Sequence, residues 1–573
     1  MATSNFADLL EDHGRKILFG ALDSVSGAKT IVWDPPLMQR FNLMTTGSAL
    51  KQRNVTNALL NDEIQKSAET LVYFVGDSNR SMSMLVEYLN RSYSHQTHHI
   101  FFVPGGSFKR REQIENLRTS VKFSQTIKSI ESLPIRWFPS PSQNPDVITM
   151  LENNIIPRLV LDGDWTQLHK CAEALLQLES MMPRRPVARY LGEWSVKLCD
   201  ILEQLRAAKC EAESKPNEDF GVDEILVIDR WTDPITPLIT QRTYAGLTDE
   251  FFGIDDLGSI KVDTNEFSEN DGKGESKEKK ILLKDDIYHE IRDSVVPGAV
   301  AAKFREIFDE LRKEEDDLKN CRSVAEMKVA VKRVELIVRK KGFAEIHMRL
   351  AEMLNLRLID DFVDDCVSCQ GDILRGVGDK VIPFIEMSII ECLDLTEVLK
   401  LISLQSLVSE GLKQETINTY RRLILHSYGQ KCLPWLMCLQ QSGLIRERGA
   451  ETHLNSKNPL ITGFPRISKQ MRLIVDDSNG AKPVDASYSY GSYAPLLVRH
   501  LESHDRSQWK TVTPSDRPIL RAPKKKMLFV IGGLTMSEIA SIRLTMPEII
   551  SICVTSTMTG SQMVRSFDQL ATG

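Results

Sequence analysis

A stretch near the middle of the chain, Glu224–Gly253, constrains the fold more than any other part of the sequence. It opens with an apolar run, Ile225–Ile228, of the kind that forms a strand buried on both faces of a parallel sheet. Pro234 and Pro237 then force an extended turn, because each proline fixes φ and restricts the residue before it. Beyond the turn, apolar residues recur at helical intervals as far as Gly253, a typical helix stop. The stretch therefore predicts a strand, a proline-rich crossover and a helix.

Short apolar runs in the first 139 residues repeat this rhythm. Ile31–Trp33, Leu71–Val75 and Ile100–Val103 are each followed by turn residues, and segments of helical length separate them. The alternation predicts an open, mainly parallel sheet with helices on both faces, as in Rossmann-like α/β folds. Two more strands, Met527–Ile531 and Ile549–Val554, lie near the C-terminus, and Thr535-x-x-Glu538 between them fits a capping box that opens a helix. We therefore expect one sheet built from two distant stretches of the chain.

Changes in composition along the chain indicate three domains. A group of prolines places the first boundary near Pro139, and the chain turns almost wholly helical over Asp285–Leu444. Val262–Lys280 has too few apolar residues to offset the entropy of ordering, so we expect a mobile loop there. The expected domains are an N-terminal α/β domain (1–139), a discontinuous second α/β domain (140–246 with 475–573) and a large inserted, mainly helical domain (247–474).

The inserted region also predicts a projecting helical hairpin at about 298–341. Its first helix starts with an apolar stripe and continues as the charged run RKEEDD, which offers no core face. Ser323-Val-Ala-Glu326 fits a capping box that opens a basic return helix. Because a helix packed on the body would keep its stripe, we expect the distal half of the pair to project into water.

Composition and charge exclude several classes of function. The net charge of −6 argues against a bulk nucleic-acid binder, which usually carries a basic excess. No run of about 18 apolar residues exists, so no direct membrane insertion is expected and any membrane contact must come through a partner. The N-terminus shows no signal-peptide pattern, and the ten cysteines are expected to be reduced thiols of a cytoplasmic protein.

The carboxylates of the central turn allow two interpretations. Asp229 and Asp233 could work as an acid–base pair. Alternatively, they cap backbone N–H groups and pair with Arg230 or Arg242. We favour capping, because no His or Cys nucleophile lies nearby in the sequence.

Two further motifs could carry chemistry. Asp162-Gly-Asp164 could hold a metal for sugar-nucleotide chemistry, but acidic residues at a helix start are routine. Cys366-x-x-Cys369 lacks the second pair of ligands that a zinc site needs, and neighbouring aspartates would disfavour a reactive thiolate. Neither G-x-G-x-x-G nor G-x-x-x-x-G-K-[ST] occurs in the chain. We expect no catalytic residues, no metal and no cofactor.

Four segments in order resemble the Sec/Munc (SM) family of SNARE-binding proteins. The central one is IDRWTDPITPLITQRTYAGLTDEFFG, and SYSYGSYAPLLVRHLE and LFVIGGLTMSEIASIR follow it. KTIVWDPPLMQRFNLMTTGSALKQRNV, near the N-terminus, is similar to the vacuolar protein sorting-associated protein 33 branch in particular. The resemblance makes Asp229, Arg230, Asp233, Pro234, Pro237 and Tyr244 a structural signature.

This resemblance implies a three-domain arch that is not an enzyme. Proteins of the family hold SNARE helices, both syntaxin-type and vesicle SNAREs, in productive register and promote membrane fusion. The branch implies a subunit of HOPS and CORVET tethering complexes, docked on vacuolar protein sorting-associated protein 16. It implies a peripheral location on late endosome, lysosome or vacuole membranes.

The resemblance also suggests two binding surfaces. A SNARE helix needs apolar anchors at helical spacing with charged flanks. The proposed SNARE-binding residues are Val300, Phe304, Phe308, Leu311, Lys328, Lys332 and Arg333. The proposed tether-docking residues are Tyr420, Arg421 and Leu433.

Two alternatives stay open at this stage. One is an α/β enzyme that acts on a nucleotide or sugar nucleotide through the aspartates named above. The other is a tether scaffold that binds no SNARE. The sequence also leaves open which hairpin residues face the core.

Overall fold

The structure, a computed structural model, is described here for residues 6–63, 68–151, 155–208, 221–263, 278–319, 324–449, 463–475, 482–514 and 525–571. The chain forms two compact units. Unit 1 comprises Met1–Leu151 with Asp256–Gly258, and unit 2 comprises Glu152–Asp255 with Ser259–Gly573. The predicted inserted helical region lies largely within unit 2, so the finer division into three domains stays a prediction.

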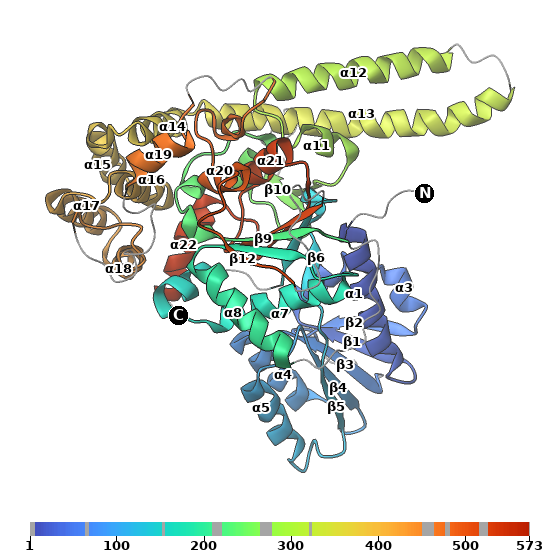
Figure 1. The fold of residues 1–573 in the computed structure, drawn as a ribbon. Coiled ribbons are helices and arrows are strands. Elements are labelled where there is room, and N and C mark those ends of the chain that lie inside the picture. The colour runs from blue at the N-terminus through green and yellow to red at the C-terminus, as the bar shows by residue number, and fades with distance from the viewer. Residues whose placement is uncertain are drawn as a thin grey trace. The chain divides into compact units, whose positions relative to one another are not determined.

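Unit 1 is built on a five-stranded parallel sheet with the order β2-β1-β3-β4-β5 (Figure 1). The three strands expected from apolar runs are confirmed as β1, β3 and β4. The sequence pattern missed β2 and β5, because these outer strands are partly exposed and carry few apolar residues. The strands are β1 Lys29–Trp33, β2 Val55–Leu59, β3 Thr70–Val75, β4 Thr97–Phe102 and β5 Ile127–Ser132, and a short antiparallel pair, β6 Trp137–Pro139 and β7 Val147–Met150, follows them.

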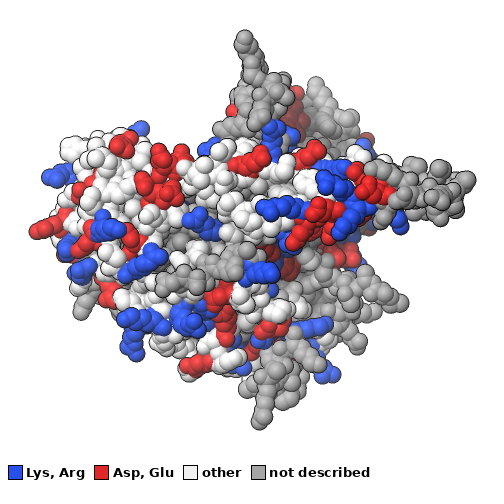
Figure 2. Space-filling model, turned by 90° about the horizontal axis from the view of Figure 1, so that it is seen from above, with Lys and Arg blue, Asp and Glu red and all other residues white. Residues whose placement is uncertain are grey.

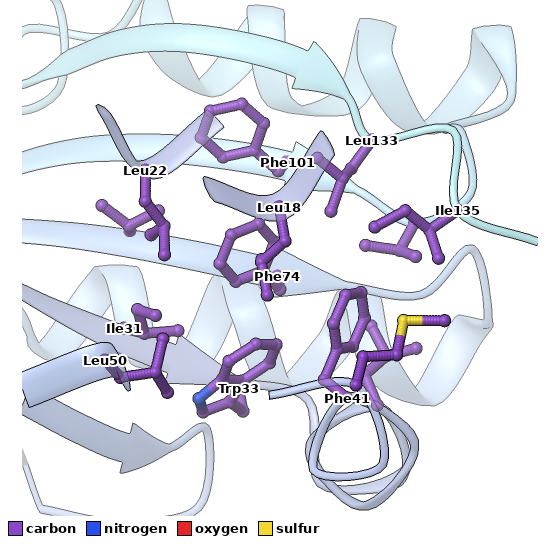
Figure 3. Close-up of a cluster of buried hydrophobic side chains, with 14 of the residues drawn as sticks. Leu18, Leu22, Ile31, Trp33, Phe41, Leu50, Phe74, Phe101, Leu133 and Ile135 are labelled. Carbon is purple, nitrogen blue, oxygen red and sulfur yellow. The ribbon is translucent and has the colours of Figure 1, made fainter. Parts of the chain in front are cut away.

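Helices cover both faces of this sheet, and one face carries an aromatic core. The Trp33 and Phe74 rings stack with centroids 4.9 Å apart, and Phe41 lies 5.1 Å from Trp33 (Figure 3). Leu18 and Leu22 close this core from the N-terminal helix. The helices of unit 1 are α1 Phe6–Asp23, α2 Pro35–Phe41, α3 Gly47–Lys51, α4 Asn79–Arg91 and α5 Phe108–Arg118.

The sheet of unit 2 joins distant parts of the chain, as predicted. The central strand β9 pairs in parallel with β13, with Ile225 opposite Met527. Its other neighbour, β8, is also parallel, and β12 adds an antiparallel edge. The strands, in spatial order, are β12 Lys510–Val512, β8 Val187–Leu191, β9 Glu224–Asp229, β13 Lys526–Ile531 and β14 Ile549–Val554.

Helices make up most of the remainder of unit 2. Those near the sheet are α6 Ile155–Pro157, α7 Thr166–Met181, α8 Glu193–Ala208, α9 Tyr244–Phe252, α20 Leu496–Glu502, α21 Met536–Thr545 and α22 Gly560–Ala571. Those of the long insertion are α11 Asp286–Ile291, α12 Gly298–Lys319, α13 Val324–Leu358, α14 Asp361–Leu374, α15 Ile382–Ile390, α16 Leu395–Val408, α17 Gln414–Ser427, α18 Leu433–Gln441 and α19 Phe464–Met471.

The expectation of a mobile loop over Val262–Lys280 is wrong at both ends. The strands β10 Ser259–Asp263 and β11 Glu278–Leu282 pair as an antiparallel ribbon. Ile260 and Val262 are buried on one side of β10, so two apolar side chains suffice to order a strand that composition alone missed. Residues 264–277 lie outside the described part of the chain.

The predicted hairpin is present and longer than expected. The helices α12 and α13 pack along each other (Figure 1). Helix α13 is 35 residues long and ends at Leu358, beyond the expected end at 341. The capping box predicted at Ser323 begins outside the described residues. Within the described ranges, no helix, α13 included, is both long and apolar enough to cross a bilayer.

Candidate functional site

The signature stretch forms the centre of unit 2. Every residue of β9 is buried, and the chain then turns through two short 3-10 segments before α9 starts at Tyr244. Pro234 and Pro237 lie buried within this turn, as the sequence predicted for the crossover. The turn therefore carries charged side chains into the interior, where each needs a partner.

Arg230 is fully buried and is held by an acidic residue from the other end of unit 2. Its Nη1 donates to both carboxylate oxygens of Glu538 at 2.7 Å. Its Nε donates to the Asp233 carbonyl oxygen at 3.0 Å. Glu538 also completes a capping box with Thr535 at the start of α21, which confirms that prediction. One ion pair thus ties the end of β9 to a helix 308 residues away.

Asp229 caps the helix that follows the neighbouring strand. Its carboxylate accepts hydrogen bonds from the backbone N–H groups of Trp194 and Ser195, both at 2.7 Å, and from the Ser195 hydroxyl. Burial raises the pKa of Asp229 to about 7, although these hydrogen bonds favour the ionised form. Gly192 adopts a φ of 103°, and a Cβ there would lie 2.2 Å from the Asp229 carboxylate. Only glycine leaves room for the cap.

Asp233 has a comparable structural role. It accepts hydrogen bonds from the backbone N–H groups of Thr236 and Leu497, both at 3.0 Å, and lies 3.2 Å from Arg230. Both signature aspartates therefore use their oxygens to hold backbone groups. These hydrogen bonds agree with the capping interpretation, and Arg230 pairs with Asp233 but not with Asp229.

Tyr244 connects the signature to the hairpin. Its hydroxyl lies 2.9 Å from Nδ1 of His347 in α13, and Nε2 of the same ring lies 2.9 Å from the Asp285 carboxylate. Tyr244 and His347 are buried, and the Asp285 side chain is 7% exposed. This chain of hydrogen bonds fixes the proximal part of α13 to α9 and to the start of α11.

The buried carboxylate of Asp249, one helical turn beyond Tyr244, gives unit 2 a pH dependence. Burial raises its pKa from 3.8 to about 6, although the carboxylate accepts a hydrogen bond from the Ile254 N–H at 2.9 Å. Between pH 3.8 and about pH 6, the Asp249 carboxyl keeps its proton in the folded protein, whereas the same carboxyl in the unfolded chain has lost it. The free energy of unfolding should therefore fall as pH rises through this window, by about 3 kcal/mol in total at about 1.36 kcal/mol per pKa unit.

The variant Asp249→Asn should lose that pH dependence. It keeps an oxygen acceptor for Ile254 and carries no charge, so it should match the wild type near pH 4 and exceed it by up to about 3 kcal/mol above pH 6. Urea unfolding at pH 4.5 and 7.5 measures the difference. Parallel pH profiles of the two proteins would contradict the assignment to Asp249.

The other residues considered for chemistry also have structural partners. Asp164 accepts hydrogen bonds from the Thr166 N–H at 3.1 Å and from the Gln167 amide at 3.1 Å, so it caps α7 as favoured from the sequence. Burial raises the pKa of Cys366 to about 12 and that of Cys369 to about 11, which leaves little thiolate at neutral pH. Within the described ranges, no three His, Cys, Asp or Glu side chains group as a metal site requires.

The apolar residues expected to line a groove on the hairpin are mostly buried within unit 2. Val300, Phe304 and Leu311 are each at most 6% exposed, and only Phe308 is partly accessible. These three residues pack inward, where they hold the hairpin together. Among the basic residues, Arg333 is exposed. The side chains of Lys328 and Lys332 lie outside the described part of the structure.

An exposed apolar face on α13 was not predicted. Val334, Val338 and Met348 are 47%, 62% and 39% exposed. Their spacing keeps them within about a third of the helix circumference. We call these three residues the hairpin face. The helix is also apolar on its buried side, so the sequence pattern could not tell which face meets a partner. Basic and acidic groups lie interspersed over the helix pair (Figure 2).

The proposed tether-docking residues are placed at different depths. Tyr420 is buried, and its hydroxyl donates to Gln405 at 3.1 Å. Arg421 is half-buried, donates to Gln440 at 3.4 Å and lines a small pocket with Ile424 and Leu436. Leu433 is partly exposed at the start of α18. Arg421 and Leu433 therefore reach the surface of the helical region, and Tyr420 supports them from inside.

Comparison with protein families gives one match over most of the chain. A model described as the Sec1 family matches residues 29–566. Vacuolar protein sorting-associated protein 33A of Caenorhabditis elegans is 33% identical, with 98% of this chain and 96% of that protein covered. The protein of the same name from Rattus norvegicus is 28% identical, with 94% and 92% covered.

Solved structures with the same fold are more distant in sequence. The Unc18–syntaxin 1 complex from Monosiga brevicollis matches at 15% identity with a TM-score of 0.63, covering 98% of this chain and 99% of that one. The SM protein Vps45 in complex with the Qa SNARE Tlg2 matches at 15% identity with a TM-score of 0.60, covering 99% and 98%. Both matches show a shared fold over essentially the whole chain.

Proposed function

Because the chain belongs to the Sec1 family, we propose that it binds SNARE helices, promotes their assembly and so promotes membrane fusion. Its relatives carry a vacuolar protein sorting name, and two structural neighbours were solved with a syntaxin or a Qa SNARE. These findings support a subunit of a HOPS- or CORVET-type tethering complex. We place it in the cytoplasm, peripheral on late endosome, lysosome or vacuole membranes through its partners.

The hairpin face carries the SNARE-binding part of this proposal. SNARE motifs are amphipathic helices, and such helices dock their apolar stripe on exposed apolar side chains at helical spacing. Val334, Val338 and Met348 provide that spacing, and the exposed Arg333 provides a charge beside it. The buried residues Phe304 and Leu311 support the face instead of contacting the partner. The basic residues Lys328 and Lys332 stay part of the proposal as charged contacts.

Val338→Asp should weaken SNARE binding at least tenfold. A carboxylate buried in an apolar interface without a partner costs about 1–3 kcal/mol, and about 1.4 kcal/mol is tenfold in affinity. The measurement is a titration of the full chain with a labelled syntaxin-type SNARE motif. Leu336→Asp is a matched control, because Leu336 is 57% exposed but projects from nearly the opposite side of α13. Equal losses in both variants would contradict the hairpin face as the binding surface.

The tether subunit is proposed to dock on the helical region around α17 and α18. Arg421 offers a half-buried guanidinium, and Leu433 offers an exposed aliphatic anchor close to the exposed Met437 on α18. Such Arg and apolar anchors dominate many interfaces. The proposed partner is vacuolar protein sorting-associated protein 16 or a counterpart in the complex.

Arg421→Asp should abolish co-precipitation of the tether subunit while the isolated protein keeps its melting temperature within a few degrees. Replacing a half-buried interface cation with an anion leaves an unpaired charge, which costs about 2–5 kcal/mol. The neighbouring Arg422 is exposed and points in a different direction, so Arg422→Asp is the control. Co-precipitation that survives Arg421→Asp would move the interface elsewhere.

We propose no catalytic activity for this protein. Three of the aspartates that an α/β enzyme would need, Asp229, Asp233 and Asp164, hold backbone groups or hydroxyls, as described above. Thermal melting in the presence of a ligand distinguishes this proposal from the enzyme alternative. Adding a nucleotide or a sugar nucleotide should leave its thermal melting unchanged.

A further inference from the structure

An exposed apolar patch lies where α13 gives way to α14. Leu356 and Ile359 are each 63% exposed at the end of α13. Three residues on, the ring of Phe362 in α14 stacks on Phe384 of α15, with centroids 6.3 Å apart. Met387, one turn further along α15, is 53% exposed. These five residues lie at the junction of three successive helices, and α13 and α14 contact each other there. We call the five residues the base patch.

Three carboxylates border the base patch. Glu352 precedes Leu356 by four residues, Asp365 follows Phe362 by three, and Glu391 follows Met387 by four. Residues three or four apart lie side by side on a helix, so each carboxylate flanks one apolar anchor. All three are exposed, and the structure gives them no ion pair with any described residue.

The charge of this border differs from that of the more distal hairpin. Residues 333–341 include four basic residues and one acidic, whereas residues 345–365 include six acidic residues and two basic. A partner that fits acidic flanks must carry basic ones, since like charges across an interface repel. The apolar centre selects a partner with its own apolar stripe. Together these features fit a helix with Leu-type anchors and Lys or Arg on both flanks.

We propose that the base patch is a docking surface for a basic amphipathic helix of a partner protein. It does not depend on the SNARE assignment, because its residues and its charge differ from those of the hairpin face. The helix lies across α13, α14 and α15 with its apolar stripe on Ile359, the Phe362–Phe384 stack and Met387. Its basic flanks face Glu352, Asp365 and Glu391.

Two designed peptides test this proposal with the full chain. They share one Leu stripe at helical spacing, and their flanks are Lys in one and Glu in the other. Fluorescence anisotropy should show that the Lys peptide binds at least tenfold more tightly than the Glu peptide. Met387→Asp, a change at an exposed position, should weaken the Lys peptide at least tenfold. No detectable binding of the Lys peptide, or unchanged binding to Met387→Asp, would overturn the proposal.

Charge reversal separates specific docking from general attraction to an acidic protein. The triple variant Glu352→Lys, Asp365→Lys, Glu391→Lys should reverse the preference between the two peptides. The control variant Glu63→Lys, Glu112→Lys, Glu115→Lys alters three exposed positions of unit 1 by the same net charge and should preserve the preference. Equal effects of the two triple variants would reduce the binding to non-specific attraction and overturn the proposal.

A last comparison places the peptide on the molecule. Val338→Asp on the hairpin face should leave the affinity of the Lys peptide unchanged. A loss there equal to that of Met387→Asp would place the peptide on the hairpin face and overturn the base patch as a separate surface. SNARE binding is measured on the same variants. This second measurement shows whether the proposed SNARE-binding function fails, separately from docking on the base patch.

Discussion

Replacing Arg230 with Leu should lower the free energy of unfolding by about 3–5 kcal/mol, because Glu538 then stays buried without its counter-charge. Both carboxylate oxygens of Glu538 accept from Arg230 at 2.7 Å, and neither side chain is exposed to solvent. Urea unfolding followed by tryptophan fluorescence measures the loss. A loss of this size would consume a large part of the stability of a typical domain.

The double variant Arg230→Leu with Glu538→Leu is the matched control. It removes the Glu538 carboxylate that Arg230→Leu leaves unpaired. It should therefore recover part of the lost free energy of unfolding, as apolar replacements of buried ion pairs often do. The recovery is incomplete, because Glu538 also closes the capping box at Thr535 and such a cap contributes about 1 kcal/mol. A single variant as stable as the wild type would show that the pair contributes nothing net.

Phe304→Ser should destabilise unit 2 by about 3–5 kcal/mol, whereas Phe308→Ser should cost less than half as much. The two rings lie on the same helix with centroids 6.5 Å apart, but Phe304 is buried and Phe308 is partly exposed. Truncating the buried ring leaves a cavity between α12 and its neighbours, and the serine hydroxyl adds a desolvation cost. Melting curves of the two single variants give the comparison.

Hydrogen exchange locates the effect of these two changes. The loss in Phe304→Ser should appear first as faster exchange in α12 and α13, because local opening frees the hairpin before unit 2 unfolds. Similar melting temperatures for Phe304→Ser and Phe308→Ser would show that the Phe304 ring is not more deeply buried than the Phe308 ring. SNARE binding by Phe308→Ser then tests whether the partly exposed ring adds to the hairpin face.

The sequence predicted those parts of the fold that local patterns determine. Continuous apolar runs identified β1, β3, β4, β9 and β13, because strands buried on both faces need no alternation. Thr535 with Glu538 located the start of α21 through the spacing of a capping box. The two outer strands of unit 1 and the β10–β11 ribbon were missed, since a strand with one exposed side carries too few apolar residues to stand out.

The site was harder to predict, because the burial of each side chain depends on partners that are distant in the chain. Phe304 and Val338 belong to the same hairpin and both are apolar, yet one is buried and the other exposed. Helical spacing identifies an apolar face but does not say whether the protein itself or a partner covers it. Similarly, the turn showed that Arg230 needed an acid, while Glu538 could be assigned only once β9 and β13 were seen to pair.

The pairing of β9 with β13 also determines when unit 2 can fold during synthesis. Glu224 lies opposite Lys526, which is translated 302 residues later. At about 5–20 residues per second the ribosome needs roughly 15–60 s for that distance. Throughout this interval β9 has one open edge and Arg230 has no carboxylate from α21. Nascent chains should therefore depend on chaperones at this stage. A premature stop codon between Leu358 and Lys526 should yield a product that is degraded, even though it retains every residue of the hairpin.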